Sequence, residues 1–600
     1  MFVLIIKKNQ FAKKIADEAD GYHFTAFRQR LYDKLKALTA NSNYSGILIA
    51  LAMGERAGIT QQQWQVFRVT GTSHLVAISG LHIGLLAGFV FFIVRRLWPY
   101  FGSASLLLAS PRAAALIAVL IAAFYAALSG FAVPAQRALI MLGIVMLSIF
   151  KLHKVQSSQV LSFALLVVLL FDPVSVLSAG FWLSFAAITI IAMAAFARLN
   201  VDNSWKTWGR LQWRISLVLI PLLIFLFQQA SLISPLTNLF AIPIVSFLVV
   251  PLVLLATSLA SFFFELSQLL FSLADYIVTA LWWSLSFLAE SSFSQWQSVK
   301  PSIVSLCLAS LGTVLLLSPK GWPAKYMGFF LLIPLFWPST DSPENNEAEI
   351  TLLDVGQGLA VVVQTQKHAL VFDTGPKFSA NFDTGAAVVI PFLRHKNINR
   401  LDKLILSHKD NDHRGGFFSL KKEIPISEVL SSYGEKGSSP CRAGDNWRWE
   451  GIFFEILNPE QHHQFKKRNN ASCVLRISVG TKSILLSADI EKKAEKRLLQ
   501  LYSDKLQSSY LISPHHGSKT SSSSAFLDAV NPEYILIPVG YRNRYRMPHS
   551  SVLARYHARS IKFLSTYSSG AISIKLGQKN SSFPPYEYRK NHLKYWNSRH

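Results

Sequence analysis

The chain has 600 residues, of which 51% belong to the apolar set AVILMFWYC and only 16% are charged. Soluble domains average about 25% charged residues, so the composition excludes a wholly soluble protein, and the length excludes a single small module. The three cysteines exclude a disulfide-rich scaffold and a zinc module built on paired cysteines. The net charge of +25 indicates an acidic partner, such as nucleic acid or anionic lipid, or a charge bias that sets membrane topology.

Residues 1–73 form an N-terminal segment that differs from the rest of the chain. Residues 11–38 have the spacing of an amphipathic helix, and the apolar run 46–53 is too short to span a bilayer. The apolar stretch 2–6 is too brief for the core of a secretory signal peptide.

Residues 74–338 alternate apolar runs with short polar joints, which predicts a polytopic α-helical membrane domain. We expect about ten helices, centred near residues 84, 122, 144, 163, 185, 224, 250, 279, 311 and 332. Several of these runs are short or contain proline, which favours broken or re-entrant helices that line a cavity.

The basic residues between these runs indicate the orientation of the chain. If the first run crosses from outside to inside, eleven Lys and Arg residues fall in inside loops, whereas only Arg137 and Lys300 fall outside. Because basic loops stay in the cytoplasm, this arrangement places the C-terminal region outside it. The N-terminal segment, with four lysines before residue 15, would then also lie outside, so either the chain lacks an upstream membrane helix or this topology is wrong.

Three polar residues, His74, Ser79 and His82, lie at the start of the first apolar run. Ionisable residues at membrane depth usually face a bundle interior or a water-filled path, so we predict that these three line a channel. The alternative is close helix packing, with the imidazoles hydrogen-bonded to neighbouring carbonyls. Asp275 has the same two interpretations, whereas Asp172 before a proline is typical of a turn between helices.

A Pro-, Ser- and Asn-rich linker, residues 339–348, precedes a region of different composition. About 10% of the first 346 residues are charged, against about 23% of the last 254. Residues 349–576 contain turns, helical patterns and strand-like runs, which predict a soluble α/β sandwich. The runs are 350–353, 360–363, 369–372, 403–406, 474–479 and 483–487. The basic, aromatic tail 577–600 has no periodicity and is expected to be disordered or to lie on a surface.

Potential metal ligands follow three predicted strands. They are His408, Asp410, Asp412 and His413 after the first, Asp489 after the second, and His515 and His516 after the third. A solvated polar loop would explain any one group, but not three strand ends together. Imidazole with carboxylate suits zinc, manganese or iron better than calcium or magnesium alone, so the sequence predicts a site for one or two such ions.

Two sets of motifs resemble known families. The run HKDNDHRGG (408–416) resembles the HxHxDH signature of the metallo-β-lactamase superfamily, with Asp410 in place of its second histidine, and the turn at Asp373 resembles another of its motifs. The runs LDVGQG (353–358), NNAS (469–472) and PHHGS (514–518) resemble the version found in the ComEC family of DNA internalisation (competence) proteins. The membrane runs GTSHLVAISGLHIG (71–84), GFWLSF (180–185) and SPLTNLFAIP (234–243) are similar to that family's competence domain.

The resemblance implies an αββα metallo-β-lactamase-like fold with two divalent metal ions, Zn or Mn. It implies a channel in the inner cell membrane that takes up one DNA strand, and an extracytoplasmic nuclease that degrades the other. It also implies partners: duplex and single-stranded DNA, the lipid membrane, other DNA-uptake proteins and a second copy of the chain.

By the same resemblance, His408 and Asp410 hold one ion, Asp412, His413 and His516 hold the other, and Asp489 bridges the two. Asp412 also orients the attacking water, and His515 contacts the phosphate or protonates the leaving oxygen. Both imidazoles of the pair are competent ligands, so the choice between His515 and His516 stays open, with His516 favoured.

The sequence departs from the family pattern at three points. Trp182 stands where the family has glutamine, which we interpret as a packing change. The superfamily histidine between the first motif and Asp489 has no counterpart, so the second ion is expected to be weaker or held by other groups. The family usually begins with membrane helices and an OB fold, and 73 residues leave no room for them, so we expect no such single-strand-binding face here.

Basic residues close to the metal motifs predict a polyanion-binding surface. The candidate DNA contacts are Ser518, Lys519, Arg542, Arg544 and Arg546, with tyrosines between the arginines as base-stacking groups. A solvated basic face beside anionic lipid is the alternative. Cys441 and Cys473 are expected to stay unpaired, since the sequence fixes no distance between them.

Two other functions stay open. One is a membrane-tethered metallohydrolase that acts on a lipid or cell-wall phosphodiester, although about ten helices exceed what an anchor needs. The other is a DNA channel whose attached domain binds DNA without cutting it, since the ligand set is altered at Asp410.

Overall fold

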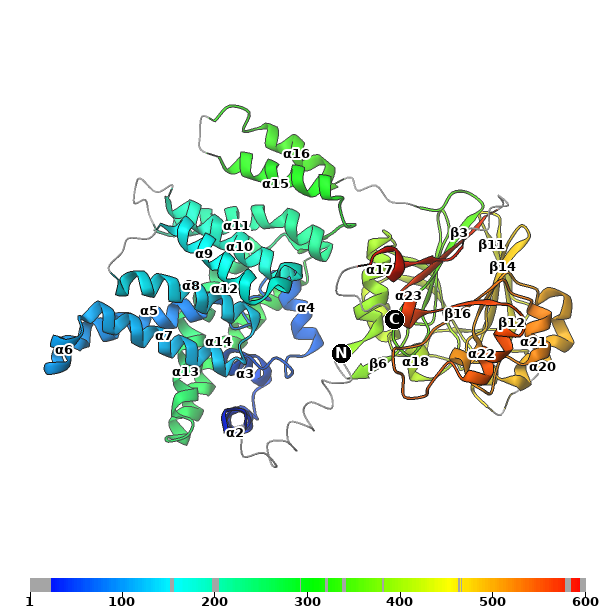
Figure 1. Cartoon of the computed structure of the whole chain (residues 1–600), viewed down its shortest axis with the longest axis horizontal. Coiled ribbons are helices and arrows are strands. Elements are labelled where there is room, and N and C mark those ends of the chain that lie inside the picture. The colour runs from blue at the N-terminus through cyan, green and yellow to red at the C-terminus, as the bar shows by residue number, and fades with distance from the viewer. Residues whose placement is uncertain are drawn as a thin grey trace. The chain divides into compact units, whose positions relative to one another are not determined.

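The computed structural model describes residues 23–151, 156–196, 204–291, 293–318, 322–336, 342–379, 382–461, 465, 467–577 and 584–593. The chain divides into two compact units, Met1–Pro338 and Ser339–His600 (Figure 1). The first unit is helical and the second is built on two β-sheets. The predicted fold class, a polytopic membrane domain followed by an αββα sandwich, is confirmed.

The first unit consists mainly of helices. They are α2 (His23–Leu38), α3 (Ser45–Met53), α4 (Gln61–Thr70), α5 (Gly80–Leu97), α6 (Ser103–Leu107), α7 (Ser110–Leu128), α8 (Val133–Phe150), α9 (Ser157–Phe171), α10 (Ala179–Phe196), α11 (Ser204–Phe227), α12 (Ser234–Pro243), α13 (Val250–Leu259), α14 (Phe264–Ala289), α15 (Ile303–Leu317) and α16 (Met327–Phe336). Short strands β1 (Gln229–Ser231) and β2 (Gln295–Gln297) pair between them.

Within the described residues, six helical stretches are long and apolar enough to cross a membrane. They cover residues 80–100, 110–128, 133–150, 207–227, 234–259 and 264–289. All ten predicted centres fall on a helix, but those in α9, α10, α15 and α16 fall on shorter apolar helices. The turn at Asp172 and Pro173 follows α9, because proline lacks the N–H that a continuing helix needs. Pro334, in contrast, lies inside α16.

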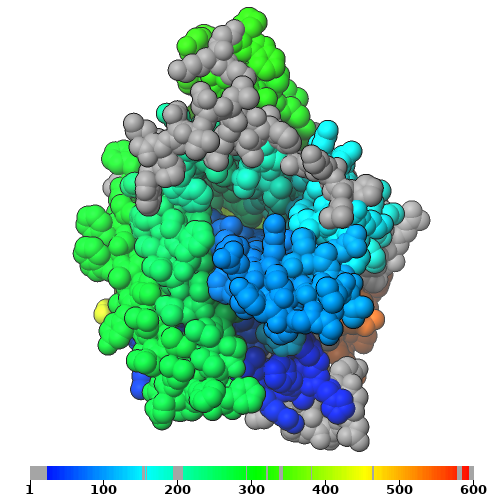
Figure 2. Space-filling model, turned by 90° about the vertical axis from the view of Figure 1, so that its left-hand side faces the viewer, coloured from blue at the N-terminus to red at the C-terminus, as the bar shows by residue number. Residues whose placement is uncertain are grey.

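The short apolar run of the N-terminal segment forms a buried helix. Every residue of α3 from Ile47 to Met53 is buried, and the core around it also takes residues from α2, α13 and α14. A second core between α5, α7 and α8 is rich in alanine, which lets helices approach closely. Figure 2 shows one face of this unit, which is hollowed between the blue residues of α5–α7 and the green residues of α12–α14.

The second unit contains two large sheets. The first has the order β10-β9-β8-β5-β4-β3-β18-β19, with β3 (Glu347–Leu352), β4 (Val361–Gln364), β5 (Ala369–Phe372), β8 (Leu401–Leu406), β9 (Ile426–Ser431), β10 (Ser439–Pro440), β18 (Ile572–Gly577) and β19 (Tyr586–Glu587). The second has the order β11-β12-β13-β14-β15-β16-β17, with β11 (Asn446–Trp449), β12 (Ile452–Asn458), β13 (Val474–Val479), β14 (Lys482–Leu486), β15 (Tyr510–Ile512), β16 (Tyr534–Ile537) and β17 (Lys562–Ser565). A separate ribbon pairs β6 (Lys377–Ser379) with β7 (Phe382–Asp383).

The two sheets pack face to face and helices cover their outer faces. Alternate residues of a strand point to opposite faces, so Ile484 and Leu486 of β14 enter the core between the sheets while Leu485 packs under the outer helices. These helices are α17 (Ile390–His395) and α19 (Phe417–Glu423) on the first sheet, and α20 (Lys492–Tyr502), α21 (Ser524–Val530) and α22 (Ser550–His557) on the second. Shorter helices are α18 (Asn411–Arg414), α23 (Thr566–Ser569) and α24 (Tyr588–Asn591).

Cys441 and Cys473 form a disulfide, so the expectation that they stay unpaired is wrong. They are 32 residues apart in the sequence, and the packing of the two sheets brings them together. Cys441 follows β10 at the edge of the first sheet, and Cys473 precedes β13 of the second. The Cys473 N–H also donates to the carbonyl of Ser407 at 2.9 Å, so the bridge lies beside the loop that carries His408.

Part of the expected basic tail packs onto the second unit. Strand β19 pairs with β18, and Arg589 in α24 forms an ion pair with Asp354 at 3.0 Å. The described part of the second unit therefore extends to residue 593.

Candidate metal centre

The seven candidate ligands lie where strands of both sheets end. His408, Asp410, Asp412 and His413 follow β8 of the first sheet, whereas Asp489 follows β14 and His515 and His516 follow β15 of the second. Because these ends meet at one edge of the sandwich, residues about 100 positions apart in the sequence come together.

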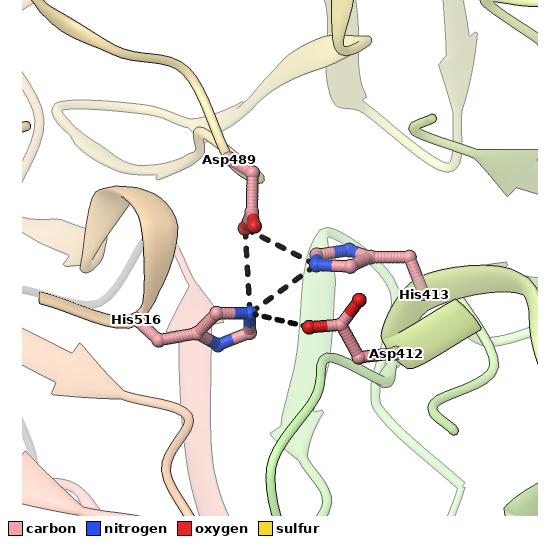
Figure 3. Close-up of side chains that lie close together, drawn as sticks. All are labelled: Asp412, His413, Asp489 and His516. Carbon is pink, nitrogen blue, oxygen red and sulfur yellow. Dashed lines mark hydrogen bonds and ion pairs between the residues drawn. The ribbon is translucent and has the colours of Figure 1, made fainter. Parts of the chain in front are cut away.

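Four of these residues form a compact cluster (Figure 3). One ligand atom from each of Asp412, His413, Asp489 and His516 lies within 4.8 Å of all the others. Oδ1 of Asp489 is 3.1 Å from Nε2 of His413 and 3.4 Å from Nε2 of His516, and these two nitrogens are 3.2 Å apart. Ligand atoms of a tetrahedral ion with bonds of about 2.0 Å are separated by about 3.3 Å, so the cluster has the dimensions of a metal site.

Of the other three residues, Asp410 lies beside His408, and His408 and His515 face the second oxygen of Asp489. Its Oδ2 is 3.6 Å from Nε2 of His515 and 4.0 Å from Nε2 of His408, and the latter is 3.7 Å from Oδ2 of Asp410. Among the described residues, Nε2 of His408 is buried and has no hydrogen-bond partner. A buried imidazole nitrogen without a partner is costly unless it binds an ion, so this group also fits a metal.

The outer nitrogens of the imidazoles are held by hydrogen bonds. Nδ1 of His413 donates to Oδ2 of Asp373 at 2.7 Å, and Nδ1 of His516 donates to the carbonyl of Pro538 at 2.8 Å. Nδ1 of His408 contacts the hydroxyl of Ser407 at 3.1 Å. With these bonds each ring presents Nε2 to the cluster, which is the tautomer that a metal ligand requires.

Asp373 is the residue of this outer layer that the ligand assignment from sequence missed. It is fully buried, and its carboxylate also accepts the N–H of Ser407 at 2.7 Å and the Ser407 hydroxyl at 2.6 Å. The sequence does contain a signal for it: an aspartate directly follows the apolar run 369–372. This run forms β5, which pairs in parallel with β8, so residues that follow the two strands lie close together.

The charges of the cluster shift its pKa values in opposite directions. Burial alone would raise the pKa of Asp489, but the charges of His413, His516 and His408 hold it well below its usual range. Burial opposes charge on Asp412 as well, yet its hydrogen bond to His516 and the charge of His413 lower its pKa to about 2. Burial would lower the pKa of His413, but Asp489 and Asp373 raise it well above its usual range. The carboxylates are therefore ionised, and a cation entering the cluster replaces protons on the imidazoles.

The backbone of the site is strained at four positions. Asp373, Ala488, His515 and His516 have φ values of 58°, 45°, 50° and 56°, in the left-handed region that residues other than glycine rarely adopt. Such strain persists where surrounding structure fixes it and is concentrated at functional sites. All four residues are ligands or neighbours of ligands.

The predicted DNA contacts fall into two classes. Ser518 is buried and its hydroxyl lies 3.1 Å from that of Thr520, whereas Lys519 is exposed. The three arginines, Arg542, Arg544 and Arg546, lie on an exposed loop, residues 541–546, which we call the basic loop. Arg542 and Arg544 lie over the rings of Tyr541 and Tyr545.

The basic loop is attached to the ligand loop of the second sheet. The N–H of His549 donates to the carbonyl of Gly517 at 2.9 Å, and a methyl group on Gly517 would lie 2.7 Å from Cβ of Pro548. Gly517 also has a φ of 80°, so glycine is required there on two grounds. The close contact holds the segment after the basic loop against His516 and its neighbours.

The predicted channel residues lie at the start of α5. Ser79 caps this helix by accepting the N–H of His82, and Nδ1 of His74 contacts the carbonyl of Gly71 at 3.1 Å. His74 is exposed, whereas His82 is completely buried. In the described residues neither ring nitrogen of His82 has a hydrogen-bond partner, so the carbonyl-bonded alternative does not apply to it.

Comparison with known proteins identifies the family. A model of the competence protein family matches residues 51–323, and a model of the metallo-β-lactamase superfamily matches residues 353–540. Competence protein ComA of Neisseria gonorrhoeae is 36% identical over 564 residues, which cover 93% of this chain and 79% of that protein. The chain belongs to the ComEC family of competence proteins.

Two further relatives extend the match. Recombination protein 2 of Haemophilus influenzae is 32% identical over 617 residues, covering 94% of this chain and 75% of that protein. ComE operon protein 3 of Bacillus subtilis is 28% identical over 589 residues, which cover 90% of this chain and 73% of that protein. The protein is therefore a membrane protein of competence, the uptake of DNA, and its second unit is a metallo-β-lactamase domain of the kind found in metal-dependent hydrolases.

Proposed function

We propose that the second unit is a metal-dependent nuclease outside the cytoplasm, which degrades one strand of incoming DNA while the first unit passes the other strand through the inner membrane. The observation that carries the proposal is that the two oxygens of Asp489 face two different sets of ligands. Its Oδ1 faces His413 and His516, and its Oδ2 faces His408 and His515. A carboxylate shared in this way suits two ions about 3.5–4 Å apart, as in enzymes that hydrolyse phosphodiesters.

The ligands form two groups of three around Asp489. Asp412, His413 and His516 would hold one ion, and His408, Asp410 and His515 the other, with Zn or Mn the ions that suit these donors. Bound ions would lower the pKa of a water and offset the charge that develops on the attacking and leaving oxygens. Asp412, partly exposed, is placed to accept a hydrogen bond from that water.

His515 has two possible roles, and the geometry favours that of a ligand. Its Nε2 is 3.6 Å from Oδ2 of Asp489, against 4.0 Å for Nε2 of His408, so as a ligand it would replace the superfamily histidine that lies between the first motif and Asp489. Its side chain is also the most exposed imidazole of the site, which suits a proton donor to the leaving oxygen. Counting metal ions in His515→Ala separates the roles: a ligand loses one ion, whereas a proton donor keeps both and loses turnover.

The basic loop supports DNA as the substrate. Its exposed arginines can contact phosphates, and its tyrosines can stack on bases. The segment that follows it packs on the turn of His516, so a duplex bound to the loop would also reach the metal centre.

Two observations support a position outside the cytoplasm. The basic residues of the first unit lie overwhelmingly in loops on one side of the predicted topology, and the second unit follows on the other side. The disulfide between Cys441 and Cys473 requires an oxidising compartment. In the first unit, the hollowed face of Figure 2 and the polar residues His74, Ser79 and His82 support a path for the transported strand.

The decisive test is a nuclease assay with bound-metal analysis on the full-length protein in detergent. With Mn²⁺ or Zn²⁺ it should degrade linear DNA, and the double variant Asp412→Ala, His413→Ala should not. His557→Ala is the matched control, because this exposed histidine of α22 packs on Phe563 away from the cluster. If the protein binds DNA but cleaves it with none of the divalent ions tested, the result would support a channel with a non-cleaving domain. If it cleaves only lipid or cell-wall phosphodiesters, the result would support a tethered hydrolase.

A further inference from the structure

A buried arginine lies near the N-terminal ends of three helices of the first unit. Arg137, in the second turn of α8, is only 3% exposed. A methyl group on Gly180, the second residue of α10, would lie 3.5 Å from its Nη2. A methyl group on Gly80, the first residue of α5, would lie 3.4 Å from Cβ of Ala138. The first turns of α5 and α10 therefore both pack on residues 137–138 of α8, and the first turn of α10 lies against the guanidinium.

The guanidinium has no partner among the described residues that explains its burial. Within the part of the chain that the structure describes, its Nε and Nη1 are buried without a hydrogen-bond partner. Asp172, the acidic residue in the turn before α10, already accepts the N–H of Val174 at 3.2 Å. A guanidinium is always charged, and a charge buried without a partner is costly, so this arrangement calls for a negative ligand.

The helix ends around Arg137 also favour a negative ligand. The N-terminus of a helix carries about half a positive charge, and α5, α8 and α10 each have 18 residues. A cation beside three such ends is repelled by all of them, whereas an anion is attracted by the helix ends and by Arg137. His82, in the first turn of α5, is a second buried side chain whose nitrogens lack partners among the described residues.

We propose that Arg137, together with the N-terminal turns of α5, α8 and α10, binds a phosphodiester anion at the outer end of the membrane unit. The predicted topology places these three helix ends outside, where DNA enters. The proposal rests on the proposed function for its preferred ligand, a phosphate of the single DNA strand. The headgroup of an anionic phospholipid has the same chemistry, and a guanidinium can bind either through two parallel hydrogen bonds.

The test measures binding of a fluorescent oligothymidylate to the full-length protein in nanodiscs, with chelator present so that no strand is cut. Arg137→Gln should weaken binding about tenfold and should reduce the slope of log K against log salt by about 0.7, the value for one single-strand phosphate contact. Arg137→Lys should keep the slope but lose part of the affinity, because an ammonium lacks the paired donors. Lys300→Gln is the matched control: Lys300 is the other basic residue predicted outside, it is exposed, and its variant should bind as wild type.

A second variant keeps the test valid if Arg137→Gln does not fold. Gly180→Leu retains the charge of Arg137 but fills the space beside its Nη2. It should weaken oligonucleotide binding about as much as Arg137→Gln does. Bound phospholipid phosphate is measured on the same samples in nanodiscs of phosphatidylglycerol and of phosphatidylcholine. If the variants bind less phosphatidylglycerol than the wild type but bind the oligonucleotide equally well, the anion site is supported and its ligand is the lipid.

The proposal is overturned if both variants bind oligonucleotide and phospholipid as wild type does. Metal-dependent cleavage by the second unit is measured in parallel and should not change in any of these variants. If the wild-type protein neither cuts nor takes up DNA, the proposed function fails, while the phospholipid measurement still decides whether Arg137 forms an anion site.

Discussion

Replacing Asp373 with asparagine tests whether the buried carboxylate behind the cluster positions His413 for a metal. The carboxylate accepts three hydrogen bonds: from Nδ1 of His413 and from the N–H and hydroxyl of Ser407. Asparagine has one acceptor oxygen, so if it keeps the N–H of Ser407, its amide group faces the other two donors. The Ser407 hydroxyl can rotate away, whereas the imidazole of His413 cannot without losing its orientation.

We expect Asp373→Asn to weaken metal binding by about 10- to 100-fold, or about 1.4–2.8 kcal/mol, the usual effect of losing a carboxylate that supports a ligating histidine. Metal affinity is measured by competition with a chelator of known affinity. Asp383→Asn is the control, because Asp383 is also buried and also accepts a backbone N–H and a serine hydroxyl, from Ala386 and Ser419, without contacting a histidine. Equal metal affinity in Asp373→Asn, Asp383→Asn and wild type would refute the positioning role.

Three further predictions address other parts of the molecule. Titration of the denatured, unreduced protein should find one free thiol, that of Cys307, and three after reduction; three before reduction would contradict the bridge and the oxidising compartment. Replacing the three arginines of the basic loop with glutamine should weaken duplex binding and reduce its salt slope by about 0.9 for each phosphate that is no longer neutralised, leaving the metal content unchanged; an unchanged slope would remove the loop from the DNA interface. Alkaline phosphatase fused after residue 600 should be active in cells, since that enzyme needs an oxidising compartment; an inactive, stable fusion would reverse the orientation.

The sequence predicted those elements whose signal is local. The run 369–372 is β5 and the run 474–479 is β13 to the residue, because apolar stretches bounded by turns are typical of buried strands. The ligands after 403–406 were recognisable for the same reason, since a buried strand is followed by four potential ligands within six residues, 408–413. In contrast, β11 has alternately exposed and half-buried residues and carries no such signal.

Features that depend on how the strands and sheets are arranged could not be predicted from the sequence. Asp373 and His413 are 40 residues apart, and only the parallel pairing of β5 with β8 brings the carboxylate to Ser407 and the imidazole. Cys441 and Cys473 belong to different sheets, and only the packing of these sheets brings them together. The proposed site around Arg137 has no signal in the sequence, because an arginine near a helix start resembles a loop charge until its burial is known.

The origin of the ligands in both sheets has a thermodynamic consequence for the whole second unit. An ion held by His413 from the first sheet and by Asp489 and His516 from the second is a cross-link that only the folded sandwich can offer. Mass action then adds folding free energy in proportion to the logarithm of the free metal concentration, about 2.7 kcal/mol at one hundred times the dissociation constant. If the unit is a metal-dependent enzyme outside the cytoplasm, as proposed, scarcity of metal there would lower both its activity and its resistance to proteases, so the amount of intact protein would follow the metal supply.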